Sequence, residues 1–336
     1  MHSGTRYSNI ELLGWTRKTI YFSLIISTIP VVLYHIVGWK WIGIPWTVAG
    51  LLGTATAFIV GFKNTQTYNR TWEARQIWGA ILNNSRAFGI MARDFMDSPS
   101  DTQSLVYRHF AWLTALRYGM RDSRTWEAQS LTHNIEYQQK YYSVPERETS
   151  LESELVKYVS AEEVKYILST KNKAAQILSQ QSKAIKQLYK DGKIDNFQFV
   201  EMERLLRDLY DQQGRSERIK NFPYPRQFAT INAVFIQIFS FLLPFGMLKD
   251  FDKVNENITG LLHGNMVWFV IPFSTLIIWM YRTLEQVGES TENPFEGSPN
   301  DVPISQMSRT IEIDLREMLG ETDLPPALQP KNNIVL

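Results

Sequence analysis

The chain has 336 residues with 35 basic and 34 acidic side chains, so its formal net charge at pH 7 is +1. This balance gives no electrostatic reason to expect a nucleic acid partner, and no zinc-finger, RNP or basic-region pattern is present. The sequence contains no cysteine, which excludes disulfides, thiolate metal sites and cysteine nucleophiles.

The first apolar run, residues 20–38, is long enough to cross a bilayer as a helix. Arg17 and Lys18 precede it, as in a signal peptide, but no small-residue cleavage site follows and a second apolar run comes directly after it. We therefore expect a retained membrane helix. Pro30 is tolerated inside such a helix because neighbouring helices or water can satisfy the carbonyl that it frees.

The second expected span covers residues 45–62, and its helical pattern continues without a break to Asp94. The first part is apolar on all sides, whereas the continuation is charged and rich in tryptophan. A helix that leaves the membrane and continues as a charged rod is typical of a conduit.

Two stripes run along this second span at four-residue spacing. One stripe consists of Thr54, Phe58 and Phe62, and the other consists of Gly53, Ala57 and Gly61. Small residues let another helix approach closely, which would turn the aromatic stripe elsewhere. The phenyl rings then either face lipid or the protein core, or surround a symmetry axis as a hydrophobic constriction that gates by dewetting.

From Asp97 to about Pro225 the sequence is polar, with apolar residues at intervals of three and four that predict helices. The break at residues 189–195 predicts a helix end, with Asp195 as the N-cap of the next helix. We expect nearly all carboxylates of this region to lie on solvated helix faces.

The third and fourth expected spans cover residues 228–248 and 266–281, and no charged residue lies within any of the four expected spans. The loop between them contains no arginine, whereas lysine and arginine concentrate at the opposite ends of the spans. The positive-inside rule therefore places both termini and the polar middle in the cytoplasm. A short amphipathic helix is expected at residues 308–320.

Signatures of catalysis are missing from the sequence. The five histidines have no metal-ligand spacing, and no Walker loop, GxSxG or dinucleotide-binding glycine pattern occurs. We therefore expect no enzyme activity, no cofactor and no small-molecule substrate.

Three segments resemble a known family. GFKNTQTYNRTWEARQIWGAILNNSR, residues 61–86, resembles the signature of the bestrophins in their prokaryotic branch. ENPFEGSPNDVP, residues 292–303, and IEIDLREMLG, residues 311–320, resemble the C-terminal part of that branch. The resemblance covers nearly the whole chain.

The resemblance implies an all-α integral membrane protein, with four transmembrane helices and a helical cytosolic body in each subunit. Five copies would surround one axial pore as a homopentamer. Residues 1–96 would form an N-terminal membrane hairpin whose second helix extends into the cytosol, and residues 97–227 a cytosolic helical region. Residues 228–282 would form a C-terminal membrane hairpin, and residues 283–336 a cytosolic segment packed on the body.

The resemblance also assigns pore residues. The narrow neck of the family maps onto Thr54, Phe58 and Phe62, where animal members have Ile-Phe-Phe. A threonine makes the outer neck wider and wetter than an isoleucine would. The lower cytosolic aperture maps onto either Ile194 or Phe197, and both also fit the start of a buried helix.

Animal bestrophins gate with calcium held by an acidic run after the NPF motif. Here NPF survives, but only Asn293 and Asp301 match positions of the calcium clasp. Calcium takes six to eight oxygen ligands, several of them charged. We therefore expect no metal site, and a chain turn packed on the cytosolic body instead.

These observations predict a channel for small monovalent ions in the bacterial inner membrane, with lipid and further copies of the chain as its partners. We expect anions such as chloride, because phenyl edges are partly positive and because Lys63 and Arg70 flank the neck. A sodium-selective channel of the same fold is the first alternative. A membrane-anchored scaffold is another, whereas the absence of charge within the spans argues against a transporter.

Overall fold

The computed structural model describes residues 1–260 and 262–336, which form two compact units. The membrane unit comprises residues 5–69 and 224–292, and the polar unit comprises residues 1–4, 70–223 and 293–336. The regular elements among the described residues are helices, together with isolated β-bridges and no strand. This confirms the predicted all-α class.

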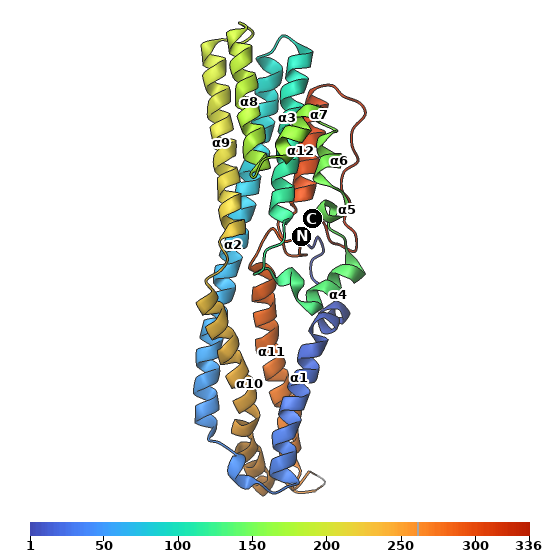
Figure 1. Cartoon of the computed structure of the whole chain (residues 1–336). Helices are drawn as coiled ribbons and strands as arrows, with labels where there is room; N and C mark the ends of the chain where they lie inside the picture. The colour runs from blue at the N-terminus through green and yellow to red at the C-terminus, as the bar shows by residue number, and fades with distance from the viewer. Residues whose placement is uncertain (261) are drawn as a thin grey trace. The chain divides into compact units, whose positions relative to one another are not determined.

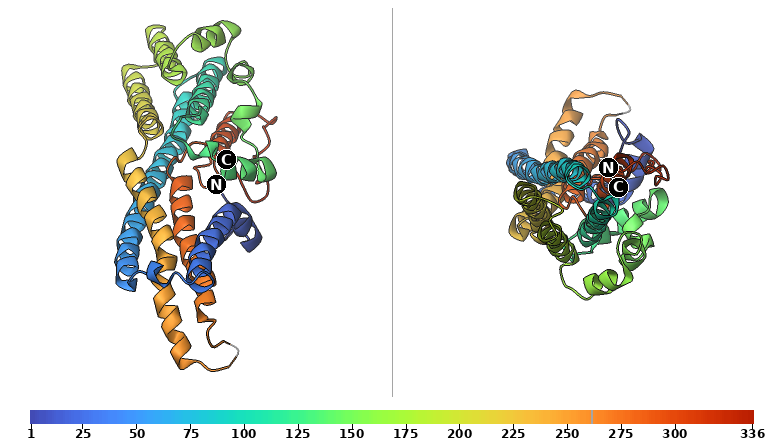
Figure 2. Two further views of the ribbon diagram at one scale, coloured as in Figure 1. Left: turned by 60° about the horizontal axis from the view of Figure 1, so that its bottom comes forward. Right: turned by 90° about the horizontal axis from the view of Figure 1, so that it is seen from above.

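The membrane unit is built from long apolar helices. The four helices α1 (Asn9–His35), α2 (Trp46–Asp94), α10 (Arg226–Val254) and α11 (Val270–Thr291) each include a stretch that is long and apolar enough to cross a membrane. Helices α1, α10 and α11 pack against one another (Figures 1 and 2). Their shared core includes Val31, Leu243 and Ile278, so the four predicted spans are confirmed as candidate spans.

Three of these helices are longer than the expected spans, and α10 extends beyond residues 228–248 at both ends. Helix α1 begins at Asn9 because Ser8 and Glu11 form a capping box, in which each side chain accepts the backbone N–H of the other residue. Helix α11 continues beyond residue 281 to Thr291. The predicted span at residues 266–281 carries no charge, but the turns of α11 beyond it carry Arg282, Glu285 and Glu289.

Helix α2 is a single element of 49 residues, as the unbroken sequence pattern predicted. At 1.5 Å per residue it is about 70 Å long, more than twice the bilayer hydrocarbon thickness of roughly 30 Å. Its residues up to Asn69 belong to the membrane unit, and those from Arg70 onwards belong to the polar unit.

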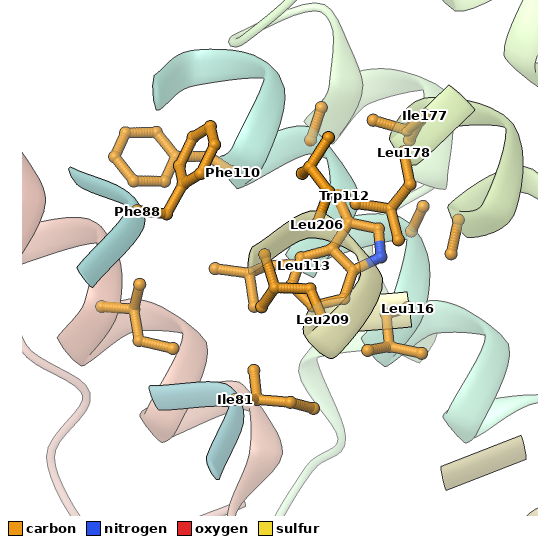
Figure 3. Close-up of a cluster of buried hydrophobic side chains, with 14 of the residues drawn as sticks. Ile81, Phe88, Phe110, Trp112, Leu113, Leu116, Ile177, Leu178, Leu206 and Leu209 are labelled. Atoms are coloured by element: carbon orange, nitrogen blue, oxygen red, sulfur yellow. The ribbon is translucent and has the colours of Figure 1, made fainter. Parts of the chain in front are cut away.

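The polar unit surrounds one buried helix, α3 (Pro99–Arg121). The residues of α3 from Ala111 to Leu116 are buried on every side, which is typical of a helix enclosed by others. Figure 3 shows α3 side chains meeting residues of α2, α8 (Lys173–Lys190) and α9 (Asn196–Asn221). The remaining helices of the unit are α4 (Thr132–Tyr141), α5 (Pro145–Glu148), α6 (Leu151–Leu155), α7 (Ala161–Leu168) and α12 (Ile304–Met318).

The helix end and the N-cap that the sequence predicts for the polar unit are confirmed. Helix α8 ends at Lys190, and Asp195 caps α9 by accepting the backbone N–H of Gln198 at 2.8 Å. Helix α12 is the predicted amphipathic helix, begun four residues earlier than expected. The two chain ends lie side by side (Figures 1 and 2), joined by an antiparallel bridge between His2 and Ile334.

Candidate functional site

Within the membrane unit, α2 has one packed face and one open face. Gly53 lies on the packed face, where a Cβ would come within 2.8 Å of the Phe239 ring of α10. The Tyr281 hydroxyl of α11 donates to the Gly53 carbonyl at 3.1 Å. The packed positions recur at the intervals of three and four that a 3.6-residue period requires; they are Ala49, Gly53, Thr56, Val60, Lys63 and Thr67.

The predicted neck residues lie on the open face. The Phe58 side chain is 77% exposed and Phe62 is 47% exposed, the Phe62 ring lying 6.4 Å from the Phe228 ring. The Thr54 hydroxyl is also exposed and donates to the Gly50 carbonyl at 3.0 Å, so its proton is already engaged within the helix. The three predicted neck positions therefore offer phenyl rings and one hydroxyl oxygen, and no charged group that could bind an ion tightly.

Within the described residues, Gly53 is the member of the predicted small-residue stripe that is buried against another helix. Ala57 and Gly61 are exposed, and a Cβ at Gly61 would have no neighbour within 4 Å. The reason is geometric, since a four-residue step advances 400° around a helix with 3.6 residues per turn. Each step therefore turns the stripe by about 40°, from the packed face towards the open one.

The basic residues that flank the neck in sequence do not line the open face. Lys63 is 2% exposed and lies on the packed face near Gly288 of α11, where its charge acts on Glu285 and Glu289. Arg70 belongs to the polar unit and donates to the Ile219 carbonyl at 3.0 Å. The Lys63 ammonium thus interacts with the carboxylates of α11 and does not lie on the face that carries the phenyl rings.

The two aperture candidates differ sharply in exposure. Ile194, in the loop before α9, is 4% exposed and belongs to the main hydrophobic core of the polar unit. Phe197, in the first turn of α9, is 81% exposed. Of the two, only Phe197 presents its side chain to its surroundings.

The two residues that match calcium-clasp positions are buried in a turn. Asp301 accepts hydrogen bonds from the backbone of Gly297 at 2.7 Å and of Ser298 at 3.1 Å, and Arg121 lies 3.4 Å from it. Burial raises the pKa of Asp301 against the opposing effect of Arg121. Asn293 is buried with its amide nitrogen unpartnered. No group of three or more histidine and acidic side chains in the described part of the chain could hold a metal ion.

Sequence reasoning missed a buried charge network beneath this turn. Arg121 donates to the Phe295 carbonyl at 3.0 Å and its Nε lies 3.5 Å from Glu146. The predicted solvated faces are therefore wrong for Glu127, Glu146 and Glu154, because tertiary contacts bury these carboxylates. Further carboxylates that tertiary contacts bury lie in the C-terminal segment: Glu296, Asp301 and Glu312. No single-sequence signal identifies them, since cations that pair with them lie far away in the chain, as Arg121 does from Asp301 and Lys220 from Glu127.

Glu296 is the carboxyl of this network with the fewest partners. One oxygen accepts the Ala128 backbone N–H at 2.9 Å, and the other is buried without a partner. Burial, with the nearby charges of Asp301 and Glu127, raises the pKa of Glu296 well above 4.5. Lys220 pairs with Glu127 beside it, and burial lowers the pKa of this lysine despite the pairing.

Comparison with known proteins gives consistent results. A family profile described as "Bacterial/Fungal Bestrophin protein" matches residues 13–317. The voltage-dependent anion channel-forming protein YneE of Escherichia coli is 24% identical over 308 residues, which cover 91% of this chain and 88% of that protein. A protein of the same description from Ralstonia nicotianae is 25% identical over 82% of this chain and 77% of its own length.

A solved structure shares the fold. The crystal structure of a bacterial bestrophin homologue from Klebsiella pneumoniae superposes with a TM-score of 0.75 and 23% sequence identity. The match covers 92% of this chain and 99% of that chain.

Proposed function

Because the chain belongs to the bacterial and fungal bestrophin family, we propose that it forms a homopentameric channel that passes small monovalent anions, chloride among them. The protein is an integral membrane protein of a family whose named relatives are anion channel-forming proteins. In this proposal Thr54, Phe58 and Phe62 form the neck, and Phe197 is the better candidate for the lower aperture.

One observation carries this proposal: the open face of α2. Phe58 is 77% exposed within the membrane unit, while the opposite face of the helix is fully packed at Gly53 and Val60. Such a face is left to lipid or to other copies of the chain. Five copies that place it around an axis would enclose a passage where an ion loses hydration without gaining a ligand, which makes this passage the main barrier.

A sodium-selective channel remains the second candidate because of where Lys63 lies. Its ammonium is on the packed face near Glu285 and Glu289, so no cation of α2 adjoins the phenyl stripe on the open face. Anion preference in the neck would then depend on the partly positive ring edges alone.

We place the protein in the bacterial inner membrane with both chain ends and the polar unit in the cytoplasm. The distribution of lysine and arginine supports this orientation. The chain has no native cysteine, so single-cysteine variants of the polar unit can be labelled from one side of the membrane at a time. Native mass spectrometry in detergent is expected to give the mass of five chains.

Reversal potentials in a planar bilayer under a potassium chloride gradient test the neck. Phe58→Ala is expected to widen and wet the passage, which raises conductance and weakens selectivity. Phe58→Ile is expected to keep the barrier but to remove the ring edges, so the reversal potential moves away from the chloride value. Ile25→Ala on α1, another exposed apolar position of the membrane unit, is the matched control and is expected to change neither quantity.

The outcomes separate the candidates. A wild-type reversal potential near the potassium equilibrium value would replace the anion channel by a cation channel. Equal values for all the Phe58 variants, with pentamers still assembled, would place Phe58 outside the pore. A stable monomer without conductance would favour a membrane-anchored scaffold.

A further inference from the structure

The polar unit contains a cavity of about 340 Å³ that the proposed channel does not use. It lies where the C-terminal ends of α3 and α9 meet the N-terminal end of α8. Leu116, Met120 and Leu151 form part of its wall. This volume falls within the range of pockets that hold small organic molecules, roughly 300–1,000 Å³, and is much larger than a halide ion requires.

Three cationic side chains at this cavity have no carboxylate partner in the described structure: Arg124, Lys171 and Lys173. The Arg124 guanidinium donates to the Asn221 amide oxygen at 3.3 Å, and the Lys173 ammonium donates to the Thr170 carbonyl at 3.5 Å. Both contacts are to neutral acceptors, so the positive charges are not compensated. Like charges around one cavity repel one another, and an anion between them would remove that repulsion.

Backbone donors lie beside these cations. Asn172 caps α8 by accepting the Ala175 N–H at 3.0 Å, which leaves the N–H groups of Lys173 and Ala174 without an acceptor among the described residues. Ala174 is a buried residue of the cavity wall. An unsatisfied buried N–H is costly, and an anion in the cavity is an acceptor that could reach it.

The cavity wall also carries carboxylates and a fourth cation. Glu217 is held by the side-chain amides of Asn172 at 2.9 Å and Gln213 at 2.8 Å, and Asp122 is exposed. Lys220 is paired with Glu127. The unpaired cations thus outnumber the wall carboxylates by three to two. One Glu217 oxygen already accepts the hydrogen bonds from the Asn172 and Gln213 side-chain amides.

From this arrangement we propose that the cavity binds a phosphate monoester. A phosphate dianion matches several converging N–H and ammonium donors, and guanidinium recognises it with two parallel hydrogen bonds. Phosphate alone would leave much of the 340 Å³ empty, whereas an organic substituent would fill the part walled by Leu116 and Leu151. The protein would therefore have a ligand site in its polar unit, separate from the ion pathway.

Isothermal titration calorimetry of the detergent-solubilised protein with glycerol 3-phosphate, at constant chloride, tests this site. The double variant Lys171→Glu/Lys173→Glu is expected to bind at least about tenfold more weakly, since each lost charge-assisted hydrogen bond is worth roughly a factor of ten. Lys183→Glu/Lys186→Glu is the matched control, because it makes the same charge change at exposed positions of the same helix. Arg124→Gln tests the site from a different segment and is expected to weaken binding as well.

No binding by the wild type at about 10 mM ligand, weaker than the range of ordinary metabolite affinities, would overturn the proposal. So would equal loss in the two double variants, which would indicate a general charge effect. Lipid headgroups with a terminal phosphate share this chemistry. The source of the phosphate is distinguished by measuring glycerol 3-phosphate binding in nanodiscs that contain phosphatidic acid and in nanodiscs of phosphatidylcholine alone. Loss of binding only with phosphatidic acid assigns the site to a lipid headgroup. Equal binding in both assigns it to a soluble ester.

Discussion

Replacing Gly288 with alanine tests whether close packing of α11 positions the neck helix. Gly288 faces α2 directly, and an alanine Cβ there would overlap the Asn64 side-chain oxygen well inside van der Waals contact. Asn64 cannot simply swing away, because its amide nitrogen donates to the Leu284 carbonyl at 3.1 Å. Asn64 is two residues from Phe62, so a displacement of α2 here would reach the proposed neck.

The magnitude follows from three contributions. Overpacking costs about 1–3 kcal/mol, and the lost Asn64 hydrogen bond costs about 1 kcal/mol. The higher helix propensity of alanine returns up to about 1 kcal/mol. We therefore expect Gly288→Ala to destabilise the protein by about 1–4 kcal/mol. At roughly 2–4 °C per kcal/mol, the conversion for domains of about 150–250 residues, the melting temperature falls by several degrees.

Thermal unfolding in detergent measures this change, and Gly14→Ala is the control. Gly14 is a helical glycine of the same unit whose Cβ would have no neighbour within 4 Å, so its replacement is expected to be neutral or stabilising. Asn64→Ala removes the overlapping oxygen. The double variant Gly288→Ala/Asn64→Ala is therefore expected to be more stable than the sum of the two single changes predicts.

The same variants are measured in the bilayer, where Gly288→Ala is expected to change conductance and Gly14→Ala is not. A Gly288→Ala protein as stable as the Gly14→Ala protein would refute the packing argument. Destabilisation that Asn64→Ala does not relieve would show that the strain comes from another contact.

Three further predictions concern the buried network of the polar unit. Arg121→Met leaves Asp301 and Glu146 without their shared cation and is expected to cost roughly 3–5 kcal/mol of unfolding free energy, measured by thermal or chemical unfolding; a loss below about 1 kcal/mol would contradict the pairing. The pKa of Glu296 is raised in the folded state, so its protonated form contributes to stability fully below pH 4.5, and this contribution is lost as the pH rises towards the folded-state pKa. Glu296→Gln is therefore expected to be more stable than wild type at neutral pH but not at pH 4. Single-channel open probability is expected to be the same in chelator and in millimolar calcium, since the Asp301 oxygens already accept backbone and Arg121 hydrogen bonds; steep activation would reveal a site completed by other oxygens.

The sequence alone determined the helical elements, because each depends on short-range signals. Apolar length identified the four candidate spans, and the absence of a helix breaker after Phe62 predicted the single helix to Asp94. Asp195 predicted the start of α9 because its side chain caps the helix locally. The family was also predicted from contiguous residues, such as residues 61–86, and the family profile confirms it.

Only the tertiary structure decided which side chains face which way. Ile194 and Phe197 are three residues apart with similar hydrophobicity, yet one is in the core and the other is exposed, because the packing of α8 on α9 decides burial. Lys63 follows Phe62 directly, but about 100° of helix rotation places it on the packed face beside Glu285 and Glu289.

The charge network and the cavity depend on residues that are far apart in the chain. Arg121 meets Asp301 across 180 positions, and the cavity brings Arg124 to Lys171 and Lys173. Carboxylate spacing is the same on a solvated face and on a buried face that meets a cation from another helix. The sequence therefore predicted the helices and the phenyl stripe along α2, whereas the three-dimensional packing determined that this stripe is exposed and which charges are buried, paired or left free.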